Sequence, residues 1–324
     1  MSGVIFLVSL TVGLIVQPLL IPWLRSRGVL DIPNERSSHA TVTPRGGGIA
    51  VVAALATGLL LGRQGGWDVA VILLIAVILG AVGLIDDFRG LSAKARLAIL
   101  LLVGAAAGLL LGSSHSLLLA VPVMVAWTAA YVNAFNFMDG INGISGLSGL
   151  VAGVAYLFMG YSFESPGLVA LGAALAGACL SFLPFNLPRA RVFLGDVGSY
   201  SVGFVIAACA WIAWAADAPP VLAIAPTSVY LVDTGVTLLR RAREGEPLME
   251  AHRSHTYQRL VTSGWSHAVV ATCVALITSL VTATIWLNYD WGQTMVGVFI
   301  AAGILAIYAF LLPLWAGVTS ADAG

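Results

Sequence analysis

The chain consists largely of long apolar segments that carry almost no charge. A helix that crosses a bilayer needs roughly 20 mainly apolar residues. Eleven segments approach or reach that length, at 3–23, 47–62, 67–85, 96–112, 116–135, 144–161, 166–185, 200–216, 219–239, 267–287 and 292–315. Hydrophobic residues make up 59% of the chain and charged residues only 9%, unlike a soluble domain. The segments lack the alternation of β-barrel strands. The sequence therefore predicts an all-α polytopic membrane protein with about 11 transmembrane helices in a single integral domain, residues 1–324.

Basic residues are concentrated in alternate connections between these segments, at 24–46, 86–95, 136–143, 186–199 and 240–266. Of the 15 Lys and Arg residues, only Arg63 falls outside these connections and the adjoining Arg96. Because basic connections are typical of the cytoplasmic side, we expect a periplasmic N-terminus and a cytoplasmic C-terminus. The first segment lacks a basic n-region and a cleavage site, so we expect it to be retained. The basic connections also hold most of the polar residues, which predicts an active site on the cytoplasmic face.

Other classes of protein fit the sequence less well. The formal net charge is zero, which argues against a nucleic-acid partner. Cys179, Cys209 and Cys273 lie in apolar segments without metal-ligand spacing, which indicates packing roles rather than a disulfide framework or a zinc site. We find no convincing internal repeat, which disfavours a secondary transporter but leaves that alternative open.

Five aspartates fall where apolar segments meet the predicted cytoplasmic connections. They are Asp86, Asp87, Asp139, Asp196 and Asp233. Acidic residues at that depth are costly unless they are paired or functional. Each one alone has an ordinary explanation, as a helix cap or the partner of an arginine. Together they favour a cation, and Mg²⁺ is commonly held by one or two carboxylates together with substrate phosphates.

Glycine-rich and basic motifs lie beside these aspartates. Glycines open the segments at "RGGGIA", "LGDVGS" and "DGINGISG", where backbone N–H groups can approach an anion, although glycine also serves helix packing in membranes. In the last long connection, Arg240 to Arg243 have the position of topological anchors. His252, Arg253 and His255 instead resemble an anion-binding or acid–base cluster.

These motifs together resemble the polyprenyl-phosphate N-acetylhexosamine-1-phosphate transferases. The resemblance runs through "DIPNERSSHATVTPRGGGIA", "GLIDDFRGLSAKARL", "NAFNFMDGINGISG", "FLPFNLPRARVFLGDVGSYSVGF", "VDTGVTLLRR" and "HRSHTYQRL", in the order of that family. Eleven spans with an outside N-terminus are similar to the branch that initiates O-antigen and related glycans. The peptidoglycan branch has ten spans and a histidine triplet, which "HRSHTYQRL" replaces here. That last pattern is similar to the subgroup that uses N-acetylfucosamine or N-acetylquinovosamine nucleotides.

The resemblance implies a reaction and its partners. An N-acetylhexosamine-1-phosphate would pass from a UDP-sugar to undecaprenyl phosphate in the bacterial inner membrane, with release of UMP. Mg²⁺ is the implied cofactor, with Mn²⁺ as a substitute. The product would initiate a cell-surface polysaccharide such as the O-antigen of lipopolysaccharide. The identity of the sugar, the pathway, and the choice between single displacement and a covalent intermediate stay open.

The resemblance also implies roles for individual residues. Asp196 would be the Mg²⁺ ligand, and Asp86 and Asp87 would orient the lipid phosphate or accept its proton. Asp139 and His255 complete the implied catalytic set. The implied substrate-binding residues are Asn133, Asn136, Phe193, His252, Arg253, Lys94, Asn186 and Asp233.

Some of these residues have a more specific implied contact. Phe193 would stack on uracil, and Lys94 with Arg96 would attract the lipid phosphate. Asn136 and Asp139 are three residues apart, so one helical turn would place both on one face.

Two alternatives to an enzyme remain, and the sequence leaves open whether the protein forms a homodimer. In a polytopic transporter, the same carboxylates would couple transport to an ion; an inactive scaffold would merely retain the motifs. Small-residue runs such as "GAALAGA" suit a homodimer interface and internal packing equally well.

Overall fold

In the computed structural model, residues 1–33, 41–62, 66–112, 116–247 and 253–314 are described, and nearly all of them are helical. The helices are α1 (Ser2–Ser26), α2 (Gly48–Gly62), α3 (Trp67–Arg89), α4 (Ala93–Leu111), α5 (Leu117–Met138), α6 (Ile144–Ser162), α7 (Pro166–Asn186), α8 (Gly195–Ala215), α9 (Pro220–Ile224), η2 (Ala225–Thr227), α10 (Ser228–Arg243), α11 (Thr256–Thr262), α12 (His267–Asp290), α13 (Thr294–Ala306) and η3 (Ile307–Leu311). The prediction of an all-α fold is confirmed in outline. The exception is a short antiparallel ribbon of β1 (Leu30–Asp31) and β2 (Thr43–Pro44), which the sequence did not predict.

Within the described residues, ten helical segments are long and apolar enough to cross a membrane. The predicted span that is not among these ten is the second along the chain, at 47–62. It forms α2, which has only 15 residues. At 1.5 Å per residue, α2 is about 22 Å long, whereas the hydrocarbon core of a bilayer is about 30 Å thick. This protein is therefore a multi-pass membrane protein whose second apolar helix is shorter than a full span.

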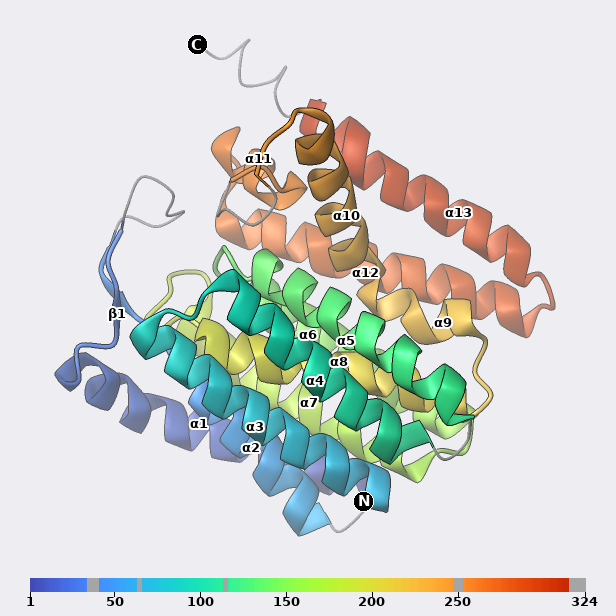
Figure 1. Cartoon of the computed structure of the whole chain (residues 1–324), viewed down its shortest axis with the longest axis horizontal. Helices are drawn as coiled ribbons and strands as arrows, with labels where there is room; N and C mark the ends of the chain where they lie inside the picture. The colour runs from blue at the N-terminus through green and yellow to red at the C-terminus, as the bar shows by residue number, and fades with distance from the viewer. Residues whose placement is uncertain (34–40, 63–65, 113–115, 248–252, 315–324) are drawn as a thin grey trace.

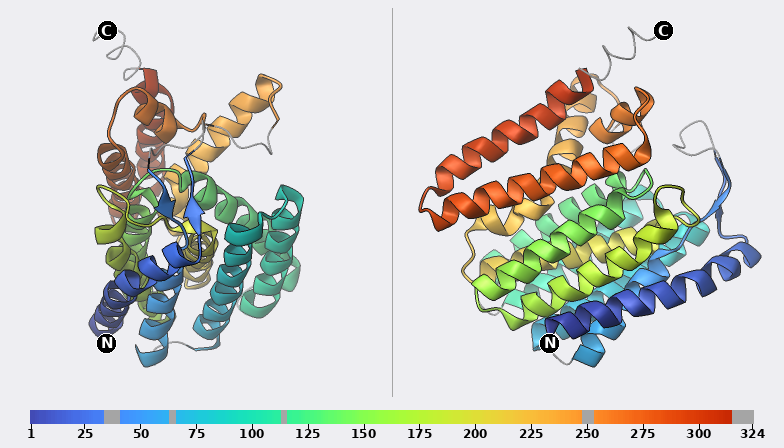
Figure 2. Two further views of the ribbon diagram at one scale, coloured as in Figure 1. Left: turned by 90° about the vertical axis from the view of Figure 1, so that its left-hand side faces the viewer. Right: turned by 180° about the vertical axis from the view of Figure 1, so that it is seen from behind.

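Helix α8 lies at the centre of the bundle and is the most enclosed of the long helices. It packs against α3, α5, α2, α6 and α7, while α12 and α13 run side by side at one edge and α1 lies at the opposite edge (Figures 1 and 2). Glycines allow the close packing, because an ideal Cβ at Gly83 of α3 would lie 2.3 Å from the carbonyl oxygen of Asp196. A Cβ at Gly48 of α2 would lie 2.3 Å from the Cα of Gly198. Small residues of this kind let helix backbones approach one another in membranes.

The predicted span at 219–239 is not one continuous helix. It consists of the short helix α9, the 3-10 turn η2 and the longer helix α10. Pro226 lies in the turn, and a proline removes a helical hydrogen bond and clashes with the preceding turn. As a result, α10 turns steeply away from the direction of its long neighbours (Figure 1). The break brings Asp233 of α10 against α11 and η3.

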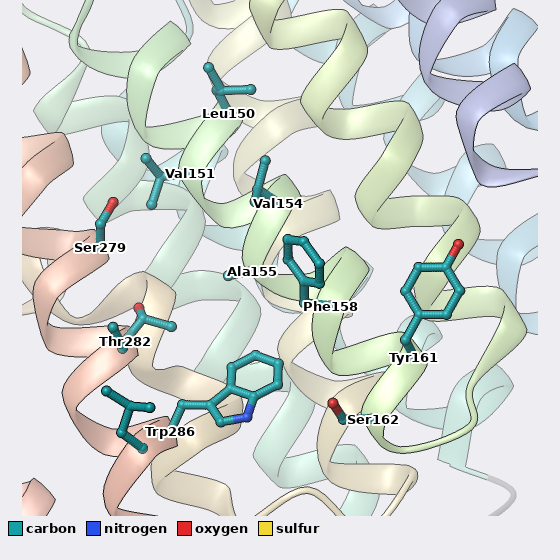
Figure 3. A pocket seen from close by; sticks show the side chains of 12 residues that line it. Leu150, Val151, Val154, Ala155, Phe158, Tyr161, Ser162, Ser279, Thr282 and Trp286 are labelled. Carbon is teal, nitrogen blue, oxygen red and sulfur yellow. The ribbon is translucent and has the colours of Figure 1, made fainter.

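An apolar groove of about 590 Å³ lies between α6 and α12 (Figure 3). Its lining includes Val154, Phe158 and Trp286. The hydroxyls of Ser279 and Thr282, which line the groove from α12, donate to carbonyls one turn earlier in that helix, so they are satisfied within it. This groove is an apolar surface, suited to contact with hydrocarbon rather than to polar chemistry.

The close approach of α3 to α8 predicts a large effect of one methyl group. Gly83→Ala should lower the stability of the folded protein by about 1–3 kcal/mol, the usual cost of overpacking, because the atoms in the way belong to the backbone of Asp196 and Val197. Thermal unfolding in detergent measures this change. Gly303→Ala is the matched control, because a Cβ at Gly303 of α13 meets nothing within 4 Å. Equal melting temperatures for the two variants would contradict the packing argument.

Candidate active site

Two consecutive aspartates, Asp86 and Asp87, lie in the last turn of α3, and their side chains face different partners. Asp86 accepts hydrogen bonds from the backbone N–H of Leu91 at 2.6 Å and from the Tyr200 hydroxyl at 2.7 Å. The Arg96 guanidinium lies 3.8 Å from the same carboxylate. Asp86 is buried, so these partners replace the water that the carboxylate loses.

Asp87 points instead toward the start of α8. Its Oδ2 accepts from the backbone N–H of Val197 at 3.2 Å, in the first turn of that helix. The Nε of Arg45 lies 3.8 Å from Oδ1, and the same arginine donates to the carbonyl oxygen of Asp87. Asp87 is therefore a buried carboxylate whose neighbours are a helix N-terminus and Arg45.

Asp196 occupies the first turn of α8 and meets α5. Gly195, with φ +75°, makes the sharp entry into the helix; a Cβ there would lie 2.7 Å from the Asp87 carboxylate. Asn136 of α5 donates to Oδ1 of Asp196 at 2.6 Å and lies 2.9 Å from the Ser199 hydroxyl. Glycine is needed at this position both for the positive φ and for the space.

Asp139 lies just beyond α5, which ends at Met138. Its backbone N–H donates to the carbonyl of Asn136 at 3.2 Å, and its carboxylate accepts from Ser145 at 2.6 Å. Burial raises the pKa of Asp139 from 3.8 to about 8, and the negative charges of Asp196 and Asp87 add to the rise. Asp139 caps the end of α5, and its bond to the carbonyl of Asn136 keeps the two residues one turn apart.

We call Asp86, Asp87, Asn136, Asp139 and Asp196 the carboxylate cluster. Within the described part of the chain, two arginines form ion pairs with these four aspartates, Arg45 with Asp87 and Arg96 with Asp86, so carboxyl groups outnumber the paired cations. Among the described residues, no three His, Cys, Asp or Glu side chains are spaced to enclose a metal ion. Hard carboxylate oxygens in this number do suit Mg²⁺ held by one or two carboxylates plus substrate oxygens. The donor set therefore fits this cation.

A second group surrounds Asp233 of α10, which is completely buried. Its Oδ1 lies 3.1 Å from Nδ1 of His255 and accepts from the backbone N–H of Thr256 at 2.9 Å. Its Oδ2 accepts from the backbone N–H of Tyr257 at 3.2 Å and from the Tyr308 hydroxyl at 2.6 Å. We call these five residues the Asp233 cluster. The contacts of Asp233 are thus internal hydrogen bonds that connect α10 to α11 and η3.

The two clusters meet at the end of α5. The hydroxyl of Tyr257 donates to the carbonyl of Phe137 at 2.9 Å, and the rings of His255 and Phe137 lie 6.2 Å apart. Burial raises the pKa of Tyr257 well above 10, with the charges of Asp233 and Asp139 adding to the rise, so its hydroxyl keeps the proton that it donates. Since Phe137 follows Asn136 directly, the Asp233 cluster packs against the loop that carries part of the carboxylate cluster.

Two other predicted substrate residues support the loops of the site. Asn186 is buried, accepts from the backbone N–H of Gly143 at 2.5 Å and donates to the carbonyl of Val192 at 2.9 Å. Phe193 is linked through its backbone to Pro44 and Gly47, each at 2.8 Å. Asn186 therefore fixes two loops against each other, while the Phe193 ring is half-buried on the segment leading to Asp196.

The remaining predicted residues are more peripheral. Asn133 donates to the carbonyl of Ala129 at 2.7 Å within α5. Lys94 is exposed in the first turn of α4, and Arg253 is exposed before α11. His252 lies outside the described residues.

Several side-chain partners of the carboxylates were not predicted as site residues, namely Arg45, Ser145, Tyr200, Thr237 and Tyr308. Tyr200 follows Asp196 by four residues, so helical spacing alone was a signal for it. Arg45 begins the "RGGGIA" motif, and a basic residue before a glycine run was a weaker signal. Tyr308 lies in an apolar segment with no charged neighbour, and nothing in the sequence marks it.

Comparisons with known proteins find clear similarities. A family model described as Glycosyl transferase family 4 matches residues 69–214, which include the whole carboxylate cluster. The chain is 30% identical to the decaprenyl-phosphate N-acetylglucosaminephosphotransferase of Mycobacterium tuberculosis, over 89% of this chain and 82% of that protein. It is 27% identical to a probable undecaprenyl-phosphate N-acetylglucosaminyl 1-phosphate transferase of Bacillus subtilis, over 88% and 86%. It is 25% identical to the phospho-N-acetylmuramoyl-pentapeptide-transferase of Clostridium novyi, over 84% and 92%.

The raised pKa of Asp139 predicts a pH-dependent effect on stability. Between about pH 4 and pH 8 the folded protein keeps a proton that the unfolded chain releases, so the stability of the wild type falls as pH rises through this range. Asp139→Asn removes the titrating group, so its melting temperature relative to the wild type should increase from pH 5 to pH 8 in chelator-treated buffer. The exposed Asp290 supplies the control variant, Asp290→Asn. A constant difference between Asp139→Asn and the wild type across this range would contradict the prediction.

Proposed function

We propose that this chain, which belongs to glycosyl transferase family 4, transfers an N-acetylhexosamine-1-phosphate from a UDP-sugar to a polyprenyl phosphate and releases UMP. The observation that carries the proposal is the carboxylate cluster at the ends of membrane helices. Four aspartates with Arg45 and Arg96 are gathered where apolar helices end. A lipid phosphate reaches a protein at that depth, because its chain lies in hydrocarbon and its head group in water.

The names of the similar proteins support the choice of substrates. Two of the three are named for transfer of an N-acetylglucosamine phosphate to decaprenyl or undecaprenyl phosphate, one of them as a probable enzyme. We therefore take undecaprenyl phosphate, or a close polyprenyl relative, as the acceptor and UDP-N-acetylglucosamine as the first donor to test. Other UDP-N-acetylhexosamines, including the N-acetylfucosamine and N-acetylquinovosamine nucleotides, belong in the same test. The product would begin a surface polysaccharide such as the O-antigen.

Charge distribution supports a cytoplasmic site in a bacterial inner membrane. Arg45, Arg96 and Arg240 lie at or near the same helix ends as the aspartates. Basic residues favour the cytoplasmic side, so we infer a periplasmic N-terminus. UDP-sugars are made in the cytoplasm, so this orientation gives the site access to its donor.

The bond changes follow from the substrates. An oxygen of the polyprenyl phosphate forms a bond to the β-phosphorus of the UDP-sugar, and the bond from that phosphorus to the oxygen bridging the α-phosphorus breaks. UMP leaves with the bridging oxygen, and a polyprenyl diphosphate sugar remains. A phosphate monoester has its second ionisation near pH 6, so the acceptor is already largely dianionic at neutral pH. Catalysis then depends mainly on positioning and on charge neutralisation.

Individual residues divide this work. Asp196 would hold Mg²⁺ together with substrate oxygens, and the bound cation would neutralise charge on the phosphates. Arg96 would orient the acceptor phosphate, with Lys94 attracting it from the membrane surface. Asp86 and Asp87 fix the two arginines and supply a carboxylate that can take a proton from the acceptor.

The donor would lie on the side of α5 and α11. Asn136 and Asp139 are suited to the nucleotide side, and the Phe193 ring is suited to stack on uracil. His255, beside the end of α5, is suited to a diphosphate or sugar oxygen, with Arg253 nearby in sequence. A transporter is the weaker alternative, because its ionisable residues would lie near the middle of the membrane rather than at helix ends.

The assay for this function uses purified protein in detergent with undecaprenyl phosphate, Mg²⁺ and a panel of UDP-N-acetylhexosamines. We expect release of UMP that requires both the lipid and the cation, together with a lipid-linked sugar diphosphate in equal amount. Absence of UMP with every nucleotide of the panel would refute the proposed reaction.

Asp196→Asn tests the assignment of the metal ligand. The variant keeps the shape of the side chain but loses its charge, so we expect turnover to fall about 10²–10³-fold, as for loss of a key electrostatic contact. Unfolding curves should stay close to those of the wild type. Asp290→Asn, at the far end of α12, removes an exposed carboxylate and should leave turnover unchanged. Near-normal turnover of Asp196→Asn would remove Asp196 from the metal site.

A further inference from the structure

We propose that Tyr308 in the last membrane helix is a positioning residue that sets the orientation of the His255 imidazole through the carboxylate of Asp233. This inference rests on the proposed function, in which His255 contacts the donor. It adds a residue that lies far along the chain from every motif of the site. The geometry that carries it is a continuous set of buried contacts from η3 to α11.

The contacts form a chain of two short links. The Tyr308 hydroxyl donates to Oδ2 of Asp233 at 2.6 Å, and Nδ1 of His255 lies 3.1 Å from Oδ1 of the same carboxylate. Asp233 is 0% exposed, Tyr308 1% and His255 2%. Polar contacts that are excluded from water in this way are strong and directional, and losing one partner is costly.

Both oxygens of Asp233 have backbone and side-chain partners. Oδ1 accepts from the N–H of Thr256 and contacts His255, with the Thr237 hydroxyl at 3.4 Å as a longer third contact, and Oδ2 accepts from the N–H of Tyr257 and from Tyr308. The two backbone contacts tie the carboxylate to the first turn of α11. The Tyr308 hydroxyl holds the other oxygen from the opposite side, so the rotation of the carboxylate about its Cβ–Cγ bond is fixed.

A fixed carboxylate determines which ring nitrogen of His255 carries a proton. A carboxylate only accepts hydrogen bonds, so Nδ1 is the donor in this contact. Nε2 lies on the opposite edge of the ring from Asp233, and it is the nitrogen that we assign to the substrate. An acidic residue that holds one ring nitrogen sets the orientation and tautomer of a histidine in this manner.

The position of Tyr308 depends on an irregular turn. Residues Ile307–Leu311 form a π-helical turn at the end of α13, and such turns are frequent at functional sites. A purely structural role would be to anchor this helix end to α10. The positioning role and the anchoring role predict different results when His255 is replaced. An anchor would affect the fold whether or not the imidazole is present, whereas a positioning residue would matter only while the imidazole is there.

The experiment is a double-mutant cycle between Tyr308→Phe and His255→Gln, with kcat/KM for the UDP-sugar as the readout. Tyr308→Phe should lower kcat/KM about 10-fold, which corresponds to about 1.4 kcal/mol and to the loss of one buried hydrogen bond. In the His255→Gln background the same change should cost less than about 2-fold, because the imidazole that it positions is gone. The KM for polyprenyl phosphate should not change.

Tyr156→Phe is the matched control. Tyr156 is also fully buried, and its hydroxyl donates to the carbonyl of Ala223 at 3.0 Å, away from both clusters. It should leave kcat/KM unchanged. An equal loss from Tyr308→Phe in both backgrounds, or no loss in either, would overturn the proposal.

A second readout does not need activity. In protein labelled with ¹⁵N-histidine, the His255 signals are identified by their loss in His255→Gln. Tyr308→Phe should shift the Nδ1 and Nε2 resonances of His255, whereas Tyr156→Phe should not. Unchanged His255 resonances in Tyr308→Phe would refute the link. If the wild type releases no UMP with any nucleotide, the proposed function fails, and the resonances still decide whether Tyr308 controls His255.

Discussion

The burial of carboxylates at the ends of apolar helices is the constraint on which this structure depends. A carboxylate that leaves water must regain its interactions from the protein or from a bound cation. Asp86 and Asp87 do so with arginines, a tyrosine and backbone N–H groups, and Asp233 does so with donors on both oxygens. Asp139 and Asp196 have fewer hydrogen-bond and ion-pair partners, and they lie close to the other carboxylates. A bound cation would therefore lower the free energy most at these two positions.

The packing of α8 explains how these charges come together. Its first turn lies between α3, α2 and α5, and the backbones meet closely because Gly83 and Gly48 carry no side chain. A bulkier residue at either position would separate Asp196 from the end of α3. The glycine motifs suggested both anion binding and helix packing. In the structure, Gly48 allows close packing, and Gly195 forms a left-handed turn that leads into Asp196.

Sequence reasoning succeeded where a local pattern determines the structure. Apolar length predicted nearly every long helix, and the cost of burying charge singled out the aspartates. It failed where the outcome depends on contacts between distant segments. The break at Pro226 lies within a continuous apolar segment, so hydropathy alone does not reveal it. The hydrogen bond between Tyr308 and Asp233 joins residues 75 positions apart. The internal role of Asp233 was missed for the same reason, because its partners come from α11 and η3.

The division of the site into two clusters bears on how relatives with different donors can share one reaction. The family match at residues 69–214 includes Asp86, Asp87, Asn136, Asp139 and Asp196, the groups suited to phosphates and a cation. The Asp233 cluster lies entirely beyond that match, on α10, α11 and η3. It touches the carboxylate cluster through Tyr257 and the carbonyl of Phe137, and it includes His255, the residue that we propose contacts the donor. We infer that the phosphoryl chemistry resides in the matched core and that selection of the sugar depends on the later segments.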